Sequence, residues 1–233
     1  MIKTCSAVGL NPAPNINFMQ EKYVVLEFFE NLPAGRFLEI GANDGVPTSD
    51  DEPVWGLKEK GWSGVYCEPN PSSCARLIKN IGPDRPDIEI VNCAITIDSG
   101  LKTFYSVTAK NGSTGTSSFR SHWLPLLPQS IQDRVDFIRP IITNTITFNQ
   151  LLDTVGSDFD FVSIDVENLA EENDEFIHSI NFARLENCKM IMIESITEKS
   201  IKYIESFGYS LYKSNKYMHS DFNYFFVKPS IPR

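Results

Sequence analysis

The stretch RFLEIGANDG, residues 36–45, decides the fold class of this chain. It begins with a short apolar run of the kind that forms a buried strand, and it ends in an acidic loop bounded by Gly41 and Gly45. Glycine lets the backbone turn tightly and lets a ligand approach closely. Open α/β sheets bind ligands beyond the carboxyl ends of their strands, so the stretch predicts a cofactor-binding loop after the first strand of such a sheet.

A second acidic residue supports this prediction. Glu68 ends the next apolar run, residues 64–67, and lies 23 residues past Gly45 (68 − 45). This is close to the interval of roughly 20 residues that places a carboxylate on the ribose hydroxyls in nucleotide-binding folds. The alternative role for Glu68 is that of a surface carboxylate beside the next helix.

The loop does not match the dinucleotide fingerprint G-x-G-x-x-G, because Asn43 and Val46 occupy its second and third glycine positions. A nicotinamide cofactor is therefore disfavoured. The loop instead offers negative charge and amide groups from Glu39, Asn43 and Asp44. These groups suit the ammonium and sulfonium end of S-adenosylmethionine, which carries no phosphate for the acids to repel. For Asp44, a turn role that uses its tolerance of unusual backbone angles is an equally good interpretation.

The rest of the chain predicts a mostly parallel α/β sheet. Helix-like and strand-like runs alternate from residue 18 to about 207, which is typical of strands joined by helical crossovers. The last two strands are too close for such a crossover, so they are expected to be antiparallel. Residues 1–17 read as an N-terminal arm and residues 18–233 as a single domain. The expected strands are 36–40, 64–67, 88–94, 159–164, 189–193, 209–212 and 223–227, and the expected helices are 18–31, 53–60, 71–81, 148–155, about 171–185 and 197–207.

The middle of the chain is harder to interpret. Residues 95–107 carry two β-like runs around Asp98-Ser99-Gly100, which predicts a hairpin extension. Beyond it, residues of about 108–140 lack a sustained period and are expected to form an irregular segment on the substrate side. A surface insertion with no role is the alternative. His122, beside Arg120 and Trp123 in this segment, is a candidate for substrate contact or base catalysis, although an exposed loop position is the favoured interpretation.

Composition narrows the class of function. The net charge of −9 disfavours nucleic acid as a partner, because nucleic-acid binders neutralise phosphates with clustered Lys and Arg. No apolar run approaches the ~18 residues of a membrane span, and no signal peptide is visible, so a cytoplasmic location is expected. The five cysteines form no Cys-x-x-Cys pair and read as reduced core residues.

Acidic residues also follow the later strands. Asp165 comes directly after the run 159–164 and is the first candidate for a catalytic base, with capping of the next helix as an equal alternative. Together with Glu167 and Glu194 it could hold a divalent cation that lowers the pKa of an acceptor hydroxyl. This metal hypothesis is not favoured, and no metal ligand is assigned.

Five blocks of the sequence resemble FkbM-type S-adenosylmethionine-dependent methyltransferases: residues 37–45, 61–71, 147–152, 160–167 and 190–194. The resemblance implies a class I, Rossmann-like sheet of seven strands with a reversed final strand and helices on both faces. It also implies methyl transfer to a hydroxyl oxygen of a small-molecule acceptor, such as a sugar or other natural product. The cofactor contacts that follow are Glu39, Gly41, Ala42, Asn43, Gly45, Glu68, Pro69, Cys93 and Ala94.

Two departures from the family pattern concern the acceptor side more than the cofactor. Asn168 stands where the family has glycine after the fourth strand, and Ser49-Asp50-Asp51 replaces the usual Ser-Asn-Thr. Two alternatives therefore stay open at this point. One is a nicotinamide-dependent oxidoreductase, and the other is a noncatalytic cofactor-binding module on the same fold.

Overall fold

The structure is a computed structural model. It describes residues 21–46, 53–110, 117–119, 125, 129–166, 170–217 and 220–229. The expected arm at residues 1–17 and the candidates His122 and Glu167 lie outside the described residues, as do both departures from the family pattern.

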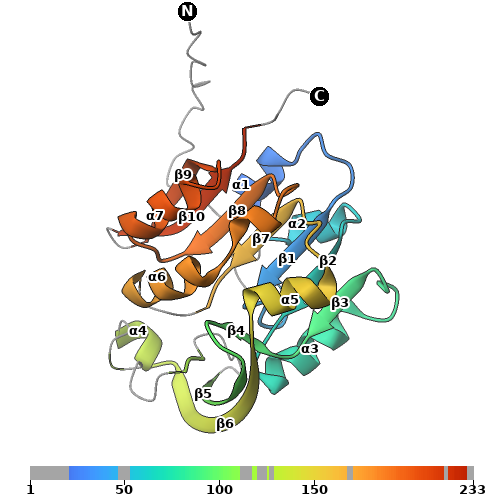
Figure 1. The fold of residues 1–233 in the computed structure, drawn as a ribbon. Helices are drawn as coiled ribbons and strands as arrows, with labels where there is room; N and C mark the ends of the chain where they lie inside the picture. Colours follow the sequence, from blue (N-terminus) through green and yellow to red (C-terminus); the bar gives the residue numbers. More distant parts are fainter. Residues whose placement is uncertain are drawn as a thin grey trace, which may run out of the picture.

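A seven-stranded sheet forms the centre of the molecule (Figure 1). Its strand order is β3-β2-β1-β7-β8-β10-β9, and all pairings are parallel except those of β10, which runs antiparallel to both β8 and β9. The predicted class, a mostly parallel sheet with a reversed final strand, is confirmed. The strands are β1 (Arg36–Ile40), β2 (Ser63–Cys67), β3 (Ile88–Val91), β7 (Phe161–Ile164), β8 (Met190–Glu194), β9 (Ser210–Tyr217) and β10 (Ser220–Val227).

Helices cover both faces of this sheet because its strands are apolar on both sides. Successive side chains of a strand point to opposite faces, so Phe37 joins one buried cluster while Leu38 and Ile40 join the other. The first cluster packs against α1 (Glu21–Phe28), α2 (Trp55–Glu59) and α3 (Pro71–Ile81). The second packs against α5 (Phe148–Val155), α6 (Ala170–Ser179) and α7 (Glu198–Glu205). A single turn of 3₁₀ helix, Phe182–Arg184, follows α6.

The start of α3 follows the sequence signal. The side-chain oxygen of Asn70 accepts a hydrogen bond from the backbone N–H of Ser72 at 3.0 Å, and Pro71 occupies the first helical position. Proline suits this position because its missing N–H would have no partner within the helix. The residue pair therefore fixes where the chain turns from the end of β2 into the helix.

A second, three-stranded sheet was not predicted. It consists of β4 (Ala94–Thr96), β6 (Val135–Thr147) and β5 (Gly100–Ala109) in that order, and the short helix α4 (Gln129–Gln132) precedes β6. The predicted hairpin within residues 95–107 is wrong, because β6 lies between the two runs, parallel to β4 and antiparallel to β5. The expectation of an irregular segment over about 108–140 is wrong for residues 135–140, which begin the 13-residue strand β6. The predicted strand 88–94 also ends early, at Val91.

The small sheet lies beyond the carboxyl ends of β1 and β7, at the lower edge of the molecule in Figure 1. Thr143 of β6 donates a hydrogen bond from Oγ1 to the carbonyl oxygen of Pro69, just after β2, at 3.3 Å. The small sheet is thus joined to the end of the main sheet where ligands bind in open α/β folds.

Candidate functional site

A cavity of about 140 Å³ opens between the carboxyl ends of β1, β2 and β7 and the small sheet. Seven residues singled out in the sequence line it: Gly41, Asn43, Glu68, Pro69, Cys93, Ala94 and Asp165. Its other lining residues are Ile40, Cys67, Ile95, Phe104, Ser117, Phe119 and Val166. Strand ends that are far apart in the sequence therefore meet at one site.

Gly41 is the tightest point of the first loop. Its φ is +91°, and a Cβ placed on it would come within 1.9 Å of the carbonyl oxygen of Asp165. Only glycine meets both demands without strain. The backbone N–H groups of Gly41 and Ala42 donate to the carbonyl oxygen of Cys67 at 2.9 and 3.1 Å. The loop is thereby held against the ends of β2 and β7.

Ala42 and Gly45 shape the loop without lining the cavity. Ala42 is buried in the cluster beneath α1 and α2, and its carbonyl oxygen accepts the N–H of Gly45 at 3.0 Å. Gly45 has a φ of +63°, and a Cβ there would lie 2.5 Å from Cδ1 of Leu77 in α3. The structure therefore places these two predicted cofactor residues in the support of the loop.

The carboxylate of Glu68 connects the loop after β1 to the turn after β2. One oxygen accepts the backbone N–H of Asn43 at 2.8 Å and the other accepts that of Asn70 at 2.6 Å. Burial raises the pKa of Glu68 to about 7, because it outweighs these two hydrogen bonds, and the negative charge of Asp165 raises that pKa further. Glu68 is therefore not an exposed carboxylate beside the helix.

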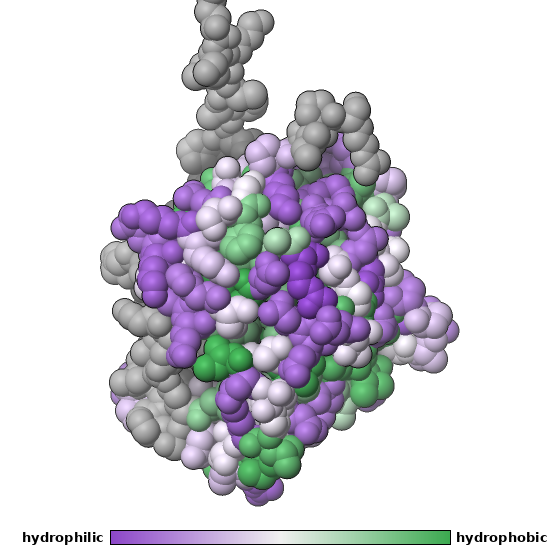
Figure 2. Space-filling view, in the orientation of Figure 1, coloured by the Kyte–Doolittle hydropathy of each residue, from purple (hydrophilic) through white to green (hydrophobic). Residues whose placement is uncertain are grey.

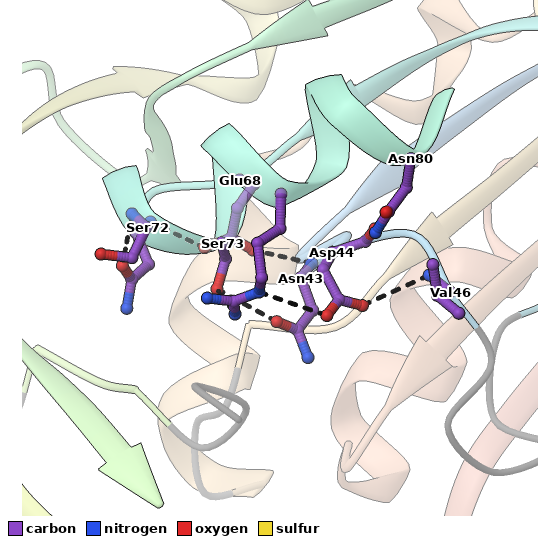
Figure 3. A network of polar contacts seen from close by, with 9 residues as sticks. Asn43, Asp44, Val46, Glu68, Ser72, Ser73 and Asn80 are labelled. Carbon is purple, nitrogen blue, oxygen red and sulfur yellow. Dashed lines mark hydrogen bonds and ion pairs between the residues drawn. The ribbon is translucent and has the colours of Figure 1, made fainter. Parts of the chain in front are cut away.

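Asn43 adopts a φ of +48°, and its side-chain oxygen accepts a hydrogen bond from Oγ of Ser73 in α3 at 3.0 Å. Asp44 turns toward the same helix (Figure 3). Its carboxylate pairs with Nε of Arg76 at 3.3 Å and accepts the N–H of Val46 at 3.3 Å. These contacts favour the turn role for Asp44 over direct contact with a cofactor, because Asp44 is not among the residues that line the cavity.

Glu39 does not line the cavity either. Its side chain is 5% exposed and, by the alternation of the strand, lies on the opposite face of the sheet from Ile40, which does line it. The prediction of a direct contact from Glu39 is therefore not supported by its position in β1.

Asp165, the predicted catalytic base, is one of two acids among the described residues that line the cavity. Its backbone N–H donates to the carbonyl oxygen of Ile40 at 2.9 Å, which fixes the residue at the end of β7. Val166, which directly follows Asp165, is not helical, whereas a capping residue is directly followed by the first residue of its helix. The geometry thus favours the cavity over the capping role.

The metal hypothesis gains no support from the residues the structure describes. Among them, no group of three or more His, Cys, Asp or Glu side chains is placed to hold a metal ion. Glu194 is buried at the end of β8, where its carbonyl oxygen accepts a hydrogen bond from Asn173 of α6 at 2.8 Å.

The four described cysteines, Cys67, Cys74, Cys93 and Cys188, are buried and form no disulfide, as expected of core residues. No helix in the described part of the chain is both long and apolar enough to cross a membrane.

The chemistry of the cavity fits S-adenosylmethionine. Among the described residues that line it there is no lysine, arginine or histidine, but there are two acids, Glu68 and Asp165. Carboxylates favour a cationic ligand, and a pyrophosphate would need basic or bare backbone partners. The opposite wall is apolar: the rings of Phe104 in β5 and Phe119 pack edge to face with centroids 5.1 Å apart.

Strand order and site together define a class I, Rossmann-like methyltransferase fold. The family model described as "Methyltransferase FkbM domain" matches residues 39–211, which is most of the chain. The chain therefore belongs to the FkbM methyltransferase family, which confirms the resemblance seen in the sequence. Among curated proteins, none matches the chain significantly.

Solved structures with a similar fold include three methyltransferases. A TehB-like SAM-dependent methyltransferase from Corynebacterium glutamicum is 9% identical with a TM-score of 0.45, covering 91% of this chain and 89% of that one. Magnesium protoporphyrin IX methyltransferase from Synechocystis, with bound SAM, is 11% identical with a TM-score of 0.44, covering 90% and 78%. Precorrin-6y C5,15-methyltransferase from Geobacter metallireducens is 13% identical with a TM-score of 0.40, covering 89% and 87%. At such values the likeness says nothing about the substrate of this chain.

Proposed function

We propose that this chain transfers the methyl group of S-adenosylmethionine to a hydroxyl oxygen of a sugar or another small polar metabolite. The observation that supports this proposal is the meeting of Glu68 and Asp165 in one cavity with no basic side chain among its described lining residues. The acids suit a cationic cofactor, and Asp165 is the acid that would accept a proton from the acceptor.

Each end of the cofactor has candidate partners in the cavity. Glu68 would accept hydrogen bonds from the ribose hydroxyls, because its oxygens have acceptor capacity beyond the two backbone N–H groups they already bind. Gly41 and Asn43 would face the amino-acid end of the cofactor. Cys93 and Ala94, with Pro69, also line the cavity and would contact the adenine base of the cofactor.

The chemical step asks little of the protein beyond alignment and removal of one proton. When bound, the cofactor supplies an electrophilic methyl group on a positively charged sulfur. Asp165 would accept the proton of the acceptor hydroxyl as its oxygen attacks, and the fixed backbone of β7 would hold the carboxylate in place. His122 remains a second candidate for this role. A divalent cation is not part of the proposal.

Calorimetric titration with S-adenosylhomocysteine and with NAD tests the cofactor. We expect saturable binding of S-adenosylhomocysteine only. The absence of that binding would overturn the proposal, and saturable NAD binding would favour the oxidoreductase alternative.

Transfer of a radiolabelled methyl group to a panel of sugars and small hydroxyl compounds tests the reaction. Asp165→Asn should abolish transfer while leaving S-adenosylhomocysteine affinity nearly unchanged. Asp153→Asn is a matched control, because Asp153 lies on the surface and pairs with Arg184 at 2.6 Å. Equal turnover in Asp165→Asn would remove this residue from the mechanism. Cofactor binding without transfer to any acceptor would favour the noncatalytic module.

We further propose that the protein acts in the cytoplasm on a free small molecule, without nucleic acid or membrane. The net charge of −9 supports this proposal, since a phosphate backbone would be repelled. Methylation of an added RNA in the same assay would contradict it.

A further inference from the structure

Asn70 connects the turn after β2 to the small sheet, and both parts contribute residues to the cofactor cavity. It is 1% exposed and follows Glu68 and Pro69, which line the cavity, although Asn70 itself does not. Its backbone N–H donates to the carboxylate of Glu68, and its side-chain oxygen caps α3. The side-chain nitrogen takes no part in these two contacts, and it points to the small sheet.

That nitrogen donates to two hydroxyl groups. It lies 2.8 Å from Oγ of Ser106 in β5 and 3.4 Å from Oγ of Ser117. Ser117 in turn accepts the backbone N–H of Val107 at 3.0 Å. A buried amide with both ends paired in this way is costly to rearrange, because each lost partner leaves a polar group without a hydrogen bond.

Residues 117–119 are also fastened to β5 by their backbone. The N–H of Tyr105 donates to the carbonyl oxygen of Ser118 at 2.7 Å, and the reverse bond measures 3.2 Å. This short bridge seats Phe119 against Phe104, so the two rings form the apolar wall of the cavity. The side chain of Asn70 thus ties that wall to the turn that carries Glu68.

We propose that Asn70 is a positioning residue that holds β5 and residues 117–119 against the turn after β2, so that the aromatic wall and Glu68 form one cofactor site. This inference rests on the proposed use of the cavity for S-adenosylmethionine. It assigns the small sheet a part in cofactor binding, in addition to any part in binding the acceptor. Thr143 makes a second tie to the same turn, through the carbonyl oxygen of Pro69.

Asn70→Ser separates the two roles of the side chain. Serine is as good a helix-capping residue as asparagine, so α3 keeps its cap, whereas the amide donor that reaches Ser106 and Ser117 is lost. We expect affinity for S-adenosylhomocysteine to fall on the order of tenfold by calorimetry, with the midpoint of thermal unfolding lowered by only a few degrees. Asn181→Ser is the matched control, because the side-chain oxygen of Asn181 also accepts the backbone N–H two residues further on, at the start of the 3₁₀ turn, and this variant should bind the cofactor normally.

A double-mutant cycle distinguishes this role from general support of the fold. Ser106→Ala alone should weaken binding by a smaller factor, because Asn70 keeps its bond to Ser117. In the Asn70→Ser background the same change should add little, since the bond is already absent. If the double variant lost affinity by the product of the two single-variant factors, the proposal would be overturned. Unchanged affinity in Asn70→Ser would overturn it as well.

Hydrogen exchange at the Tyr105 amide gives a second readout. Binding of S-adenosylhomocysteine should slow this exchange in the wild type and do so much less in Asn70→Ser or, if that variant fails to fold, in Ser106→Ala. Equal slowing in the variants would contradict the inference. Lack of cofactor binding by the wild type would instead overturn the proposed function, so the two failures are distinguishable.

Discussion

Glu68 accepts the backbone N–H of Asn43 at 2.8 Å, across 25 residues of sequence, so the end of β2 holds the loop after β1 in place. The contact is a charge-assisted hydrogen bond only while Glu68 is ionised. Burial raises the pKa of this carboxyl to about 7, so the carboxyl titrates near neutral pH.

Cofactor affinity should therefore rise with pH. Ribose hydroxyls and a cationic sulfur both favour the ionised form of Glu68, and about one tenth of the cofactor-free protein carries that form at pH 6. We expect S-adenosylmethionine affinity to increase roughly tenfold between pH 6 and pH 8, measured by calorimetry. Glu68→Gln should bind more weakly and with little dependence on pH. A wild-type affinity that is flat over this range would contradict the assigned role.

The same shift predicts the opposite trend for stability of the cofactor-free protein. The pKa of Glu68 is about 7 in the folded protein, whereas an unperturbed glutamate, as in the unfolded chain, has a pKa of 4.5, so the folded protein binds the proton more tightly. The stabilisation is fully present below pH 4.5 and is lost as pH rises to about 7, by up to about 3 kcal/mol. Urea unfolding at pH 5 and pH 8 checks this, with Glu68→Gln expected to lose less stability across the interval than the wild type.

Gly41 should tolerate no side chain. Gly41→Ala combines a φ of +91° with a Cβ 1.9 Å from the carbonyl oxygen of Asp165, so β1 and β7 would have to separate at the site. We expect a loss of about 3 kcal/mol or more in urea unfolding, together with loss of cofactor binding. Gly61→Ala is the control, because its φ is +83° but nothing lies within 4 Å of the added Cβ. It should cost about 1–2 kcal/mol. Similar losses in both variants would show that the close approach is unimportant.

The main sheet could be predicted because its strands are short, apolar on both faces and separated by helices with clear signals. The small sheet could not, because β6 has apolar side chains on both faces and two of them are exposed, Phe137 at 44% and Ile142 at 65%. In such a strand, apolar and polar residues do not alternate, so the sequence lacks the period of two that predicts a half-buried strand. Its pairing with β5 also joins residues far apart in the sequence, which local patterns do not reveal.

The sequence predicted the part of the candidate site that lies on the loops after β1, β2 and β3. Gly41, Asn43 and Glu68 line the cavity, whereas Glu39 lies on the other face because a strand reverses its side chains at each residue. The aromatic wall was missed. Phe104 belongs to a strand whose place over the cavity depends on β6, so no local signal in the sequence could have assigned it.

Asp44 offers a test of the alternative that the sequence left open. Its carboxylate is engaged by Arg76 and by the N–H of Val46, outside the cavity. Asp44→Asn keeps the turn geometry and removes the charge, so we expect cofactor affinity within about threefold of the wild type and a stability loss of about 1 kcal/mol or less. A large loss of affinity, comparable with that of Glu68→Gln, would show that Asp44 contacts the cofactor directly.

Phe104 should contribute to cofactor affinity through the apolar wall. It is 4% exposed, and its ring packs edge to face on Phe119 beside the cavity. Phe104→Ala removes apolar surface that a bound ligand would cover, so we expect affinity for S-adenosylhomocysteine to fall by about tenfold or more in calorimetry. Phe104→Leu should recover part of this loss. Phe137→Ala is the control, because Phe137 lies in the same sheet but does not line the cavity and should leave affinity unchanged. Equal effects of Phe104→Ala and Phe137→Ala would mean that the substitutions act through the stability of the small sheet and not through contact with the ligand.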